Sequence, residues 1–195
     1  MSRQKEFERE ETLEKALDVF WTKGYNKTSF QDLTEGMCVN RQSIYDTYGD
    51  KHALFIEALN YYYDKNNAST GALVAQDKPV KQLLSTFFDN VININTGDKK
   101  NRGCMLQNAT NEMLPDDKEV AEIVNRNIAA NTQNLQALIN RGIKTGEIKP
   151  DANAQALALF LLNTVQGIIT LSKSVSDKKK LRAIADTAIE AVVKG

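Results

Sequence analysis

Two short helical segments joined by a tight turn, near the N-terminus, constrain the fold of this chain more than any other feature. Thr28 and Ser29 are residue types that cap helix N-termini. Thr28 with Gln31, or Ser29 with Asp32, has the spacing of a capping box. The sequence therefore predicts that a short helix begins here and that a second helix follows it closely.

The second helix is predicted to begin at Asn40, another good N-cap residue. Arg41, Gln42 and Ser43 stand at its start, and the apolar Ile44 follows them. Arginine can pair with guanine O6/N7 and glutamine with adenine N6/N7 in the major groove. Polar residues before an inward-facing apolar residue favour a helix-turn-helix whose second helix enters that groove.

Several residues around these helices have donors that can reach phosphate oxygens. Such contacts fix the register of a protein on DNA without reading its sequence. The predicted DNA-binding set, with base readers and phosphate contacts together, is Thr28, Ser29, Asn40, Arg41, Gln42, Ser43, Tyr45, Tyr48 and Lys51.

Bulk charge does not by itself indicate a nucleic-acid ligand. The 195 residues carry 25 basic and 25 acidic side chains, so the formal net charge is zero. Five acids crowd the start of the first predicted helix, and carboxylates facing DNA would repel phosphate. We therefore expect this group to point away from the duplex: Glu6, Glu8, Glu10, Glu11 and Glu14.

Helical periodicity dominates the whole chain, with no convincing strand alternation. The sequence predicts an all-α protein of nine helices, with a head at 1–50 and a larger body at 51–195. The first helix is expected over about 7–23 and the fourth over about 51–66. The later helices are expected over about 79–95 and 104–113, and from about 115, 150 and 176 onward.

Catalytic and metal chemistry find little support in the sequence. Cys38 and Cys104 lack metal-ligand spacing, and His52 is the single histidine. The chain offers no Glu-x-x-His pair, no nucleophile with a histidine partner and no phosphate-binding glycine loop. We therefore expect no catalytic residue, no metal and no cofactor.

The most apolar stretch, 152–171, is interrupted by polar residues and is better explained as a buried helix than as a membrane span. The charged N-terminus lacks the apolar region of a signal peptide. A cytoplasmic protein without a membrane partner is the expectation.

The segment from Leu13 to Phe55 resembles the DNA-binding domain of the TetR family of transcriptional repressors. The matching signature is Phe20-x-x-x-Gly24-Tyr25-x-x-Thr28-Ser29, then Asp32-Leu33, then Val39-Asn40-Arg41-Gln42-Ser43-Ile44-Tyr45-x-x-Tyr48-Gly49-Asp50-Lys51-x-x-Leu54. The resemblance implies an all-α homodimeric repressor on a palindromic operator in double-stranded DNA. It also implies a divergent C-terminal domain that binds a small-molecule effector, whose binding releases the DNA.

The turn departs from the family pattern. The family usually has Ala-Gly-Val, whereas this chain has Met37-Cys38-Val39 and a glycine displaced to Gly36. A left-handed residue costs about 1 kcal/mol or more for cysteine and little for glycine, so we expect a turn of different shape. A redox-sensing regulator switched through Cys38 is an alternative function.

The resemblance also directs attention to the body. The segment 102–108 is similar to one branch of the family, in which the sixth helix lies between effector pocket and head. Candidate pocket residues are Phe87, Phe88, Met105, Asn108, Met113 and Phe160. The eighth helix is apolar nearly all round, which predicts that it faces both the core and a partner subunit. The predicted dimer interface comprises Leu157, Phe160, Thr164, Gly167, Ile168, Ile184 and Ala188.

Two other classes of function remain open from the residues alone. One is an enzyme built on a helical bundle, although no catalytic constellation supports it. The other is a helical adaptor whose head binds a protein in place of DNA. The steep salt dependence of phosphate contacts would separate a DNA-binding head from both.

Overall fold

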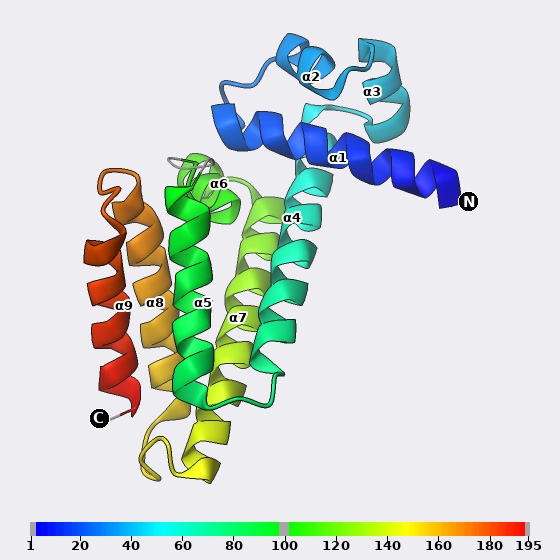
Figure 1. The fold of residues 1–195 in the computed structure, drawn as a ribbon. Coiled ribbons are helices and arrows are strands. Elements are labelled where there is room, and N and C mark those ends of the chain that lie inside the picture. The colour runs from blue at the N-terminus through cyan, green and yellow to red at the C-terminus, as the bar shows by residue number, and fades with distance from the viewer. Residues whose placement is uncertain (1–2, 98–101, 194–195) are drawn as a thin grey trace. The chain divides into compact units, whose positions relative to one another are not determined.

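The computed structural model describes residues 3–97 and 102–193, with side chains from residue 9 onward. Figure 1 shows that the described chain is helical throughout, as predicted. The helices are α1 (Arg3–Lys23), α2 (Phe30–Met37), α3 (Arg41–Tyr48), α4 (Lys51–Val74), α5 (Val80–Thr96), α6 (Met105–Met113), α7 (Lys118–Thr145), α8 (Ala154–Ser172) and α9 (Lys178–Val193).

The chain forms two compact units whose bounds differ from a simple division into head and body. The first unit comprises Met1–Lys65 and Met105–Asn125, and the second comprises Asn66–Cys104 and Arg126–Gly195. Helices α4 and α7 each contribute to both units, and α6 belongs to the same unit as the N-terminal helices.

The core of the first unit follows the predicted helical faces. Helix α1 buries the apolar stripe that its periodicity predicts, and α2 and α3 bury the residues that face it. The buried side chains of the first three helices are Leu13, Ala16, Leu17, Phe20, Leu33, Met37, Ile44 and Tyr48. Gly24 ends α1 with φ +81°, the left-handed conformation expected of it.

Helix α4 is longer than the sequence suggested. The polar stretch after Asn66 was expected to be a helix end or loop, but the helix continues to Val74. Leu73 is buried in the core of the second unit, and Arg141 donates to the carbonyls of Val74 (3.3 Å), Gln76 (2.9 Å) and Lys78 (3.2 Å). Burial and this distant arginine thus stabilise a helix end that local composition does not favour.

Three later helices begin after the residues that were expected to start them. Asp117 accepts from the Val120 N–H at 3.0 Å, so α7 begins at Lys118 and not at Pro115. Asn153 accepts from the Ala156 N–H at 3.0 Å and caps α8. Helix α9 begins at Lys178 rather than at 176. Side-chain caps decided the first two boundaries, because they satisfy N–H groups of the first helical turn that have no partner within the helix.

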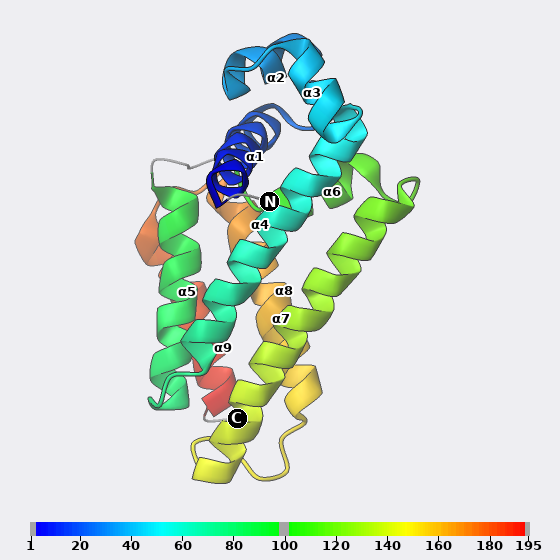
Figure 2. The ribbon, with the colours of Figure 1, turned by 90° about the vertical axis from the view of Figure 1, so that its right-hand side faces the viewer.

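In the second unit, the helices pack around one apolar core. Helices α5, α8 and α9 contact one another, and Figures 1 and 2 show them side by side. Helix α8 is long and apolar enough to cross a membrane by length and composition alone. Here it packs one face, which includes Leu161, Val165 and Ile168, into the core that α5 and α9 also build. That packing explains the apolar composition of this face.

Gly36 permits the close approach of α2 to α1. A Cβ atom at this position would lie 2.2 Å from Cγ2 of Val19 in α1. Valine is branched at Cβ and has few rotamers available to it in a helix. The glycine that is displaced from the turn therefore has a packing role of its own.

We predict that Gly36→Ala destabilises the protein by about 1–2 kcal/mol, because overpacking against Val19 outweighs the roughly 1 kcal/mol gain in helix propensity. Gly71→Ala is the matched control, since a Cβ at Gly71 in α4 meets nothing within 4 Å. Urea unfolding followed by circular dichroism measures both. Equal midpoints for the two variants would contradict the close approach.

Candidate nucleic-acid interface

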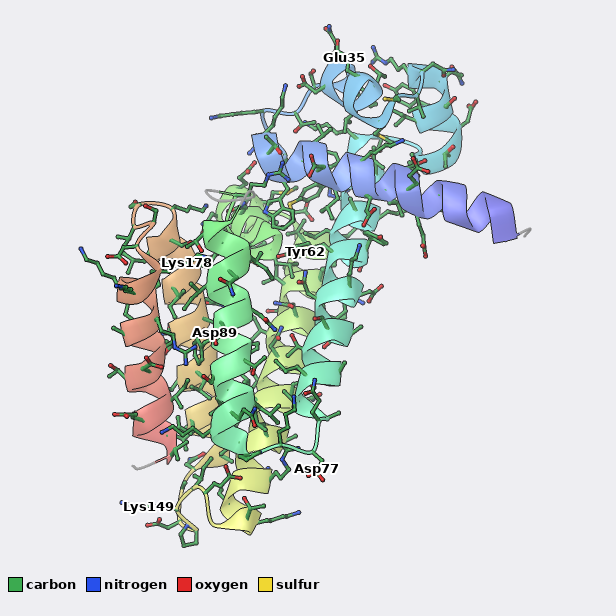
Figure 3. The ribbon with its side chains drawn as sticks, in the orientation of Figure 1. Glu35, Tyr62, Asp77, Asp89, Lys149 and Lys178 are labelled. Atoms are coloured by element: carbon green, nitrogen blue, oxygen red, sulfur yellow. The ribbon has the colours of Figure 1, made fainter. Side chains whose placement is uncertain are left out.

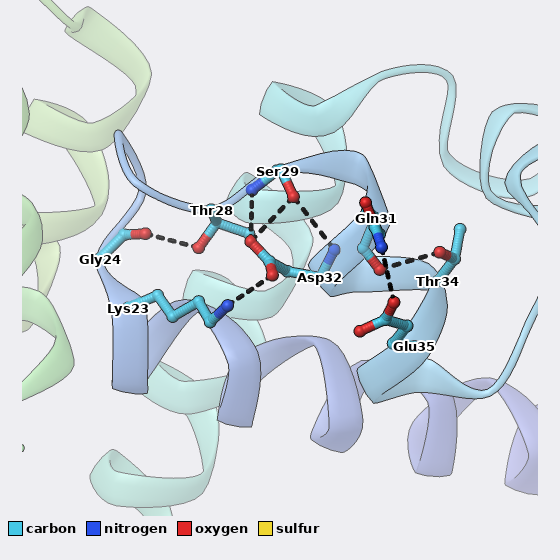
Figure 4. Close-up of polar contacts among 8 residues, drawn as sticks. All are labelled: Lys23, Gly24, Thr28, Ser29, Gln31, Asp32, Thr34 and Glu35. Carbon is cyan, nitrogen blue, oxygen red and sulfur yellow. Dashed lines mark hydrogen bonds and ion pairs between the residues drawn. The ribbon is translucent and has the colours of Figure 1, made fainter.

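A complete capping box starts α2, and Figure 4 shows its hydrogen bonds. The Ser29 hydroxyl accepts from the Asp32 N–H at 3.1 Å, and the Asp32 carboxylate accepts from the Ser29 N–H at 2.9 Å. Of the two predicted pairings, Ser29 with Asp32 is the one that forms. Lys23 of α1 pairs with the same carboxylate (Figure 4). Hydrogen bonds from Lys23 and Ser29 lower the pKa of Asp32 to about 2.

The turn keeps a left-handed residue although glycine is absent from it. Cys38 has φ 58° and ψ 39°. Its N–H donates to the Glu35 carbonyl at 3.4 Å, and the Val39 N–H donates to the Thr34 carbonyl at 3.2 Å. These two bonds form the pattern that closes a helix around a left-handed residue. The expectation of a differently shaped turn was wrong in this respect, because the backbone bonds hold cysteine in the costly conformation.

Helix α3 presents its first three side chains to solvent. Asn40 caps it by accepting from the Ser43 N–H at 2.8 Å. Arg41, Gln42 and Ser43 are exposed, whereas Ile44 is fully buried. The helix is thus oriented by one apolar residue, and its polar N-terminal end lies on the surface.

Two aromatic rings support the Arg41 guanidinium. Phe30 at the start of α2 stacks on Tyr45 of α3 with ring centroids 5.0 Å apart. The guanidinium carbon lies 4.8 Å from the centroid of Phe30 and 5.5 Å from that of Tyr45. Phe30 is half-buried, and its ring contacts Tyr45 and the Arg41 guanidinium.

Two predicted phosphate contacts have structural partners within the protein. Thr28 is 2% exposed, and its hydroxyl donates to the Gly24 carbonyl at 2.6 Å. Tyr48 is 7% exposed, and its ring lies under the Arg9 guanidinium, 5.6 Å from centroid to Cζ. Burial raises the pKa of Tyr48. Their positions favour a role in packing over direct contact with DNA.

The remaining predicted contacts are more accessible. Ser29 and Tyr45 are exposed, and Lys51 is half-buried with its ammonium 4.4 Å from the centroid of Tyr25. Burial lowers the pKa of Lys51.

Within the first unit, α6 and the residue before α7 make several contacts with earlier parts of the chain that the sequence did not predict. Glu112 of α6 accepts from the Asn26 N–H at 3.0 Å, in the turn between α1 and α2. His52 Nε2 lies 2.7 Å from Asp117 Oδ2. Burial would raise the pKa of Asp117, but hydrogen bonds from Val120 and His52 lower it overall.

The acids of α1 are partly neutralised by nearby basic groups. Glu11 pairs with Lys15 at 2.8 Å, and Glu14 pairs with Lys65 of α4. The side chains of Glu6 and Glu8 lie outside the described part of the structure.

The predicted effector residues are divided between the two units. Phe87 and Phe88 are buried in the second unit, and Phe160 lies on its surface, 43% exposed. The other three, Met105, Asn108 and Met113, belong to the first unit. Because Phe160 faces outward, it does not line the interior of its own unit.

A hollow of about 400 Å³ does lie on the surface of the second unit, and none of the predicted effector residues lines it. It is formed by α5 and α9, from which Figure 3 labels Asp89 and Lys178. Arg182 occupies part of it and binds Asp89, Asp186 (2.8 Å) and the Ser85 carbonyl (3.2 Å). The arginine is therefore already satisfied by protein groups.

The predicted dimer residues divide into core and surface groups. Ile168 and Ala188 are 1% and 3% exposed, because they pack into the core of their own unit. Gly167, Phe160 and Ile184 are exposed. The two remaining residues are half-buried: Leu157 and Thr164.

Metal ligands do not cluster in the described residues: no group of three or more His, Cys, Asp or Glu side chains is placed to hold an ion. Cys38 is exposed and Cys104 is half-buried, and both are free thiols. The capped α2, the closed turn and the exposed start of α3 define a helix-turn-helix protein.

Comparison with known proteins agrees with this geometry. Residues 13–58 match the model described as bacterial regulatory proteins, tetR family, and residues 80–188 match the tetracyclin repressor-like C-terminal domain. The chain belongs to the TetR family and is a DNA-binding transcriptional regulator. Known relatives are accordingly named as regulators and not as enzymes.

Individual relatives match over nearly the full chain. The transcriptional repressor ComR of Escherichia coli K12 is 30% identical, over 96% of this chain and 90% of that protein. The uncharacterised regulator YezE of Bacillus subtilis 168 is 29% identical, over 97% and 98%. The solved structure of the regulator CifR with a 26-base-pair operator DNA has TM-score 0.83 and 25% identity, covering 94% of this chain and 96% of that one.

We predict that the capping box makes stability depend on the charge of Asp32. A pKa lowered from 3.8 to about 2 in the folded protein means that this contribution is present above about pH 4 and is lost as pH falls through about 2. Asp32→Asn should lower the urea midpoint at pH 7, and its difference from the wild type should shrink between pH 4 and pH 2. Asp64→Asn, at an exposed α4 position, is the control. A difference that is constant with pH would contradict the assigned pKa.

Proposed function

We propose that the protein is a repressor that binds a palindromic operator as a homodimer and is released from it by a small-molecule effector. The observation that carries the DNA-binding part is the exposed start of α3, where Arg41, Gln42 and Ser43 stand beside the fully buried Ile44. A recognition helix in the major groove requires an apolar residue that packs against the protein and polar donors that face the bases.

Base reading is assigned to Arg41, Gln42 and Ser43. Arg41 suits guanine O6/N7, and Gln42 suits adenine N6/N7. The Gln42 amide nitrogen donates to Asp46 at 2.7 Å, which orients the amide and leaves its second N–H and its oxygen for a base. Asn40 acts as the cap that orients all three.

Phosphate contacts are assigned to Tyr45 and Lys51. Ser29 is exposed as well, but its N–H and its hydroxyl both donate to the Asp32 carboxylate at 2.9 Å, so a phosphate contact would have to displace one of these bonds. Thr28 and Tyr48 are assigned to support this surface from within the protein, because both are buried. Phosphate contacts position the recognition helix, whereas the base contacts select the sequence.

Dimerisation through α8 and α9 is supported by their exposed apolar side chains. Leu159, Phe160, Leu171 and Ile184 are between 38% and 47% exposed in the single chain. Large apolar side chains that stay exposed in the single chain favour burial against a partner. A two-fold dimer would present two recognition helices to half-sites about 34 Å apart, and such half-sites form a palindrome.

Repression through operator DNA is supported by the relatives, and release by an effector is the further step that we propose. ComR is named a repressor, and CifR was solved with operator DNA. The bond of Glu112 to the Asn26 N–H connects α6 with the turn between α1 and α2, and the contact of His52 with Asp117 connects the start of α4 with the residue before α7. We propose that effector binding in the body moves helices α4 and α6, which changes the spacing of the two recognition helices. The protein would act on cytoplasmic DNA.

Selection from random double-stranded DNA with the full-length protein tests this function. We expect a palindromic site whose affinity falls steeply with salt concentration, because bound phosphates release counterions. Arg41→Ala should weaken binding about tenfold or more and relax one base preference in each half-site. Lys149→Ala, which removes an exposed positive charge from the second unit, should change neither. Failure to enrich any sequence would refute operator recognition.

The dimer interface has its own test. Phe160→Glu should shift the protein from dimer to monomer in sedimentation velocity, because it places a charge in an apolar contact. Operator affinity should fall with it. Gln133→Glu adds the same charge to an exposed position of α7 and should leave the dimer intact. A Phe160→Glu variant that remains dimeric would place the interface elsewhere.

A further inference from the structure

The Arg41 side chain contacts two aromatic residues that come from different helices. We call Phe30 of α2 and Tyr45 of α3 the aromatic platform. Their rings stack at an interplanar angle of 23°. The guanidinium carbon lies within 5.5 Å of both ring centroids, and Arg41 Nη2 donates to the Tyr45 hydroxyl at 3.1 Å.

The platform supports the positive charge of Arg41 without a carboxylate. Among the described residues, no acidic group forms an ion pair with Arg41. A carboxylate would occupy the same in-plane N–H donors that guanine O6 and N7 require. An aromatic ring instead attracts the cation through its face. The charge is stabilised while donors at the edge of the guanidinium stay available.

We propose that Phe30 is a positioning residue for operator recognition, acting through Arg41. Together with Tyr45 it holds the guanidinium at the N-terminal end of α3, where it reads a guanine. This inference rests on the proposed function, because it assumes that Arg41 contacts a base. Phe30 stands at the first position of α2, and its ring contacts Arg41 and Tyr45.

The physical gain is preorganisation. An arginine side chain has many rotamers, and part of that rotamer entropy is lost when the guanidinium is fixed on a base. On the platform, much of that freedom is lost before DNA binds. The Tyr45 hydroxyl accepts from Arg41 and keeps its own hydrogen, which it can donate to a phosphate. The aromatic platform thereby connects a base contact by Arg41 with a phosphate contact by Tyr45.

Phe30→Leu tests the platform, because it keeps an apolar side chain but removes the ring face. With the full-length protein and the site that the wild type selects, we expect about fivefold weaker binding, the magnitude of a cation–π contact. The base preference should flatten at the same position that Arg41→Ala flattens. Phe30→Tyr keeps an aromatic ring at this position, so its affinity and its base preference should match those of the wild type.

A double-mutant cycle separates positioning from general destabilisation. In the Arg41→Ala background, Phe30→Leu should cause no further loss, because the side chain that it positions is gone. Equal losses from Phe30→Leu in both backgrounds, or a loss spread over every base position, would show a purely structural role and overturn the inference. Thermal unfolding of each variant identifies loss of folded protein.

The proposed function and this inference fail in different ways. If the wild type enriches no sequence, operator recognition fails and the role of Phe30 fails with it. If the wild type selects a site and Phe30→Leu selects the same site with unchanged affinity, only the positioning role is overturned.

Discussion

The left-handed backbone at Cys38 is the constraint on which the exposed polar start of α3 depends. It reverses the chain after α2, and Asn40 starts α3 two residues later. Met37 and Ile44, on either side of the turn, are both buried, so the direction of α3 is set by one conformation and two apolar contacts. A cysteine carries the conformational cost that glycine would avoid. The closing hydrogen bonds of the turn offset that cost.

The polar residues of the first unit fall into two physical groups. Thr28 and Asp32 satisfy backbone or charged groups within the protein, and their donors and acceptors are occupied. The Arg41 guanidinium lies against the rings of Phe30 and Tyr45, and these contacts leave N–H groups at the edge of the guanidinium available to a ligand. A surface that recognises another molecule needs both groups, because the first group holds rigidly the helices that present the second.

Structural features that depend on residues close together in the sequence were predictable. The capping box of Ser29 with Asp32, the Asn40 cap and the buried face of α1 all depend on residues within a few positions of one another. Features that depend on distant partners were not. Arg141 stabilises the end of α4 from α7, and nothing near Asn66 in the sequence indicates that arginine. Likewise Asp117 lies 65 residues from His52.

By itself, the sequence determined the helical class, the family and the polar start of α3, because hydrophobic period, cap spacing and signature residues are local properties of the chain. The tertiary structure alone decided which of those polar residues remain accessible. Thr28 and Tyr48 carry suitable donors but are buried by neighbours, while Phe30 reaches the surface and meets Arg41. Accessibility depends on how helices pack against one another, and packing joins residues that the sequence keeps apart.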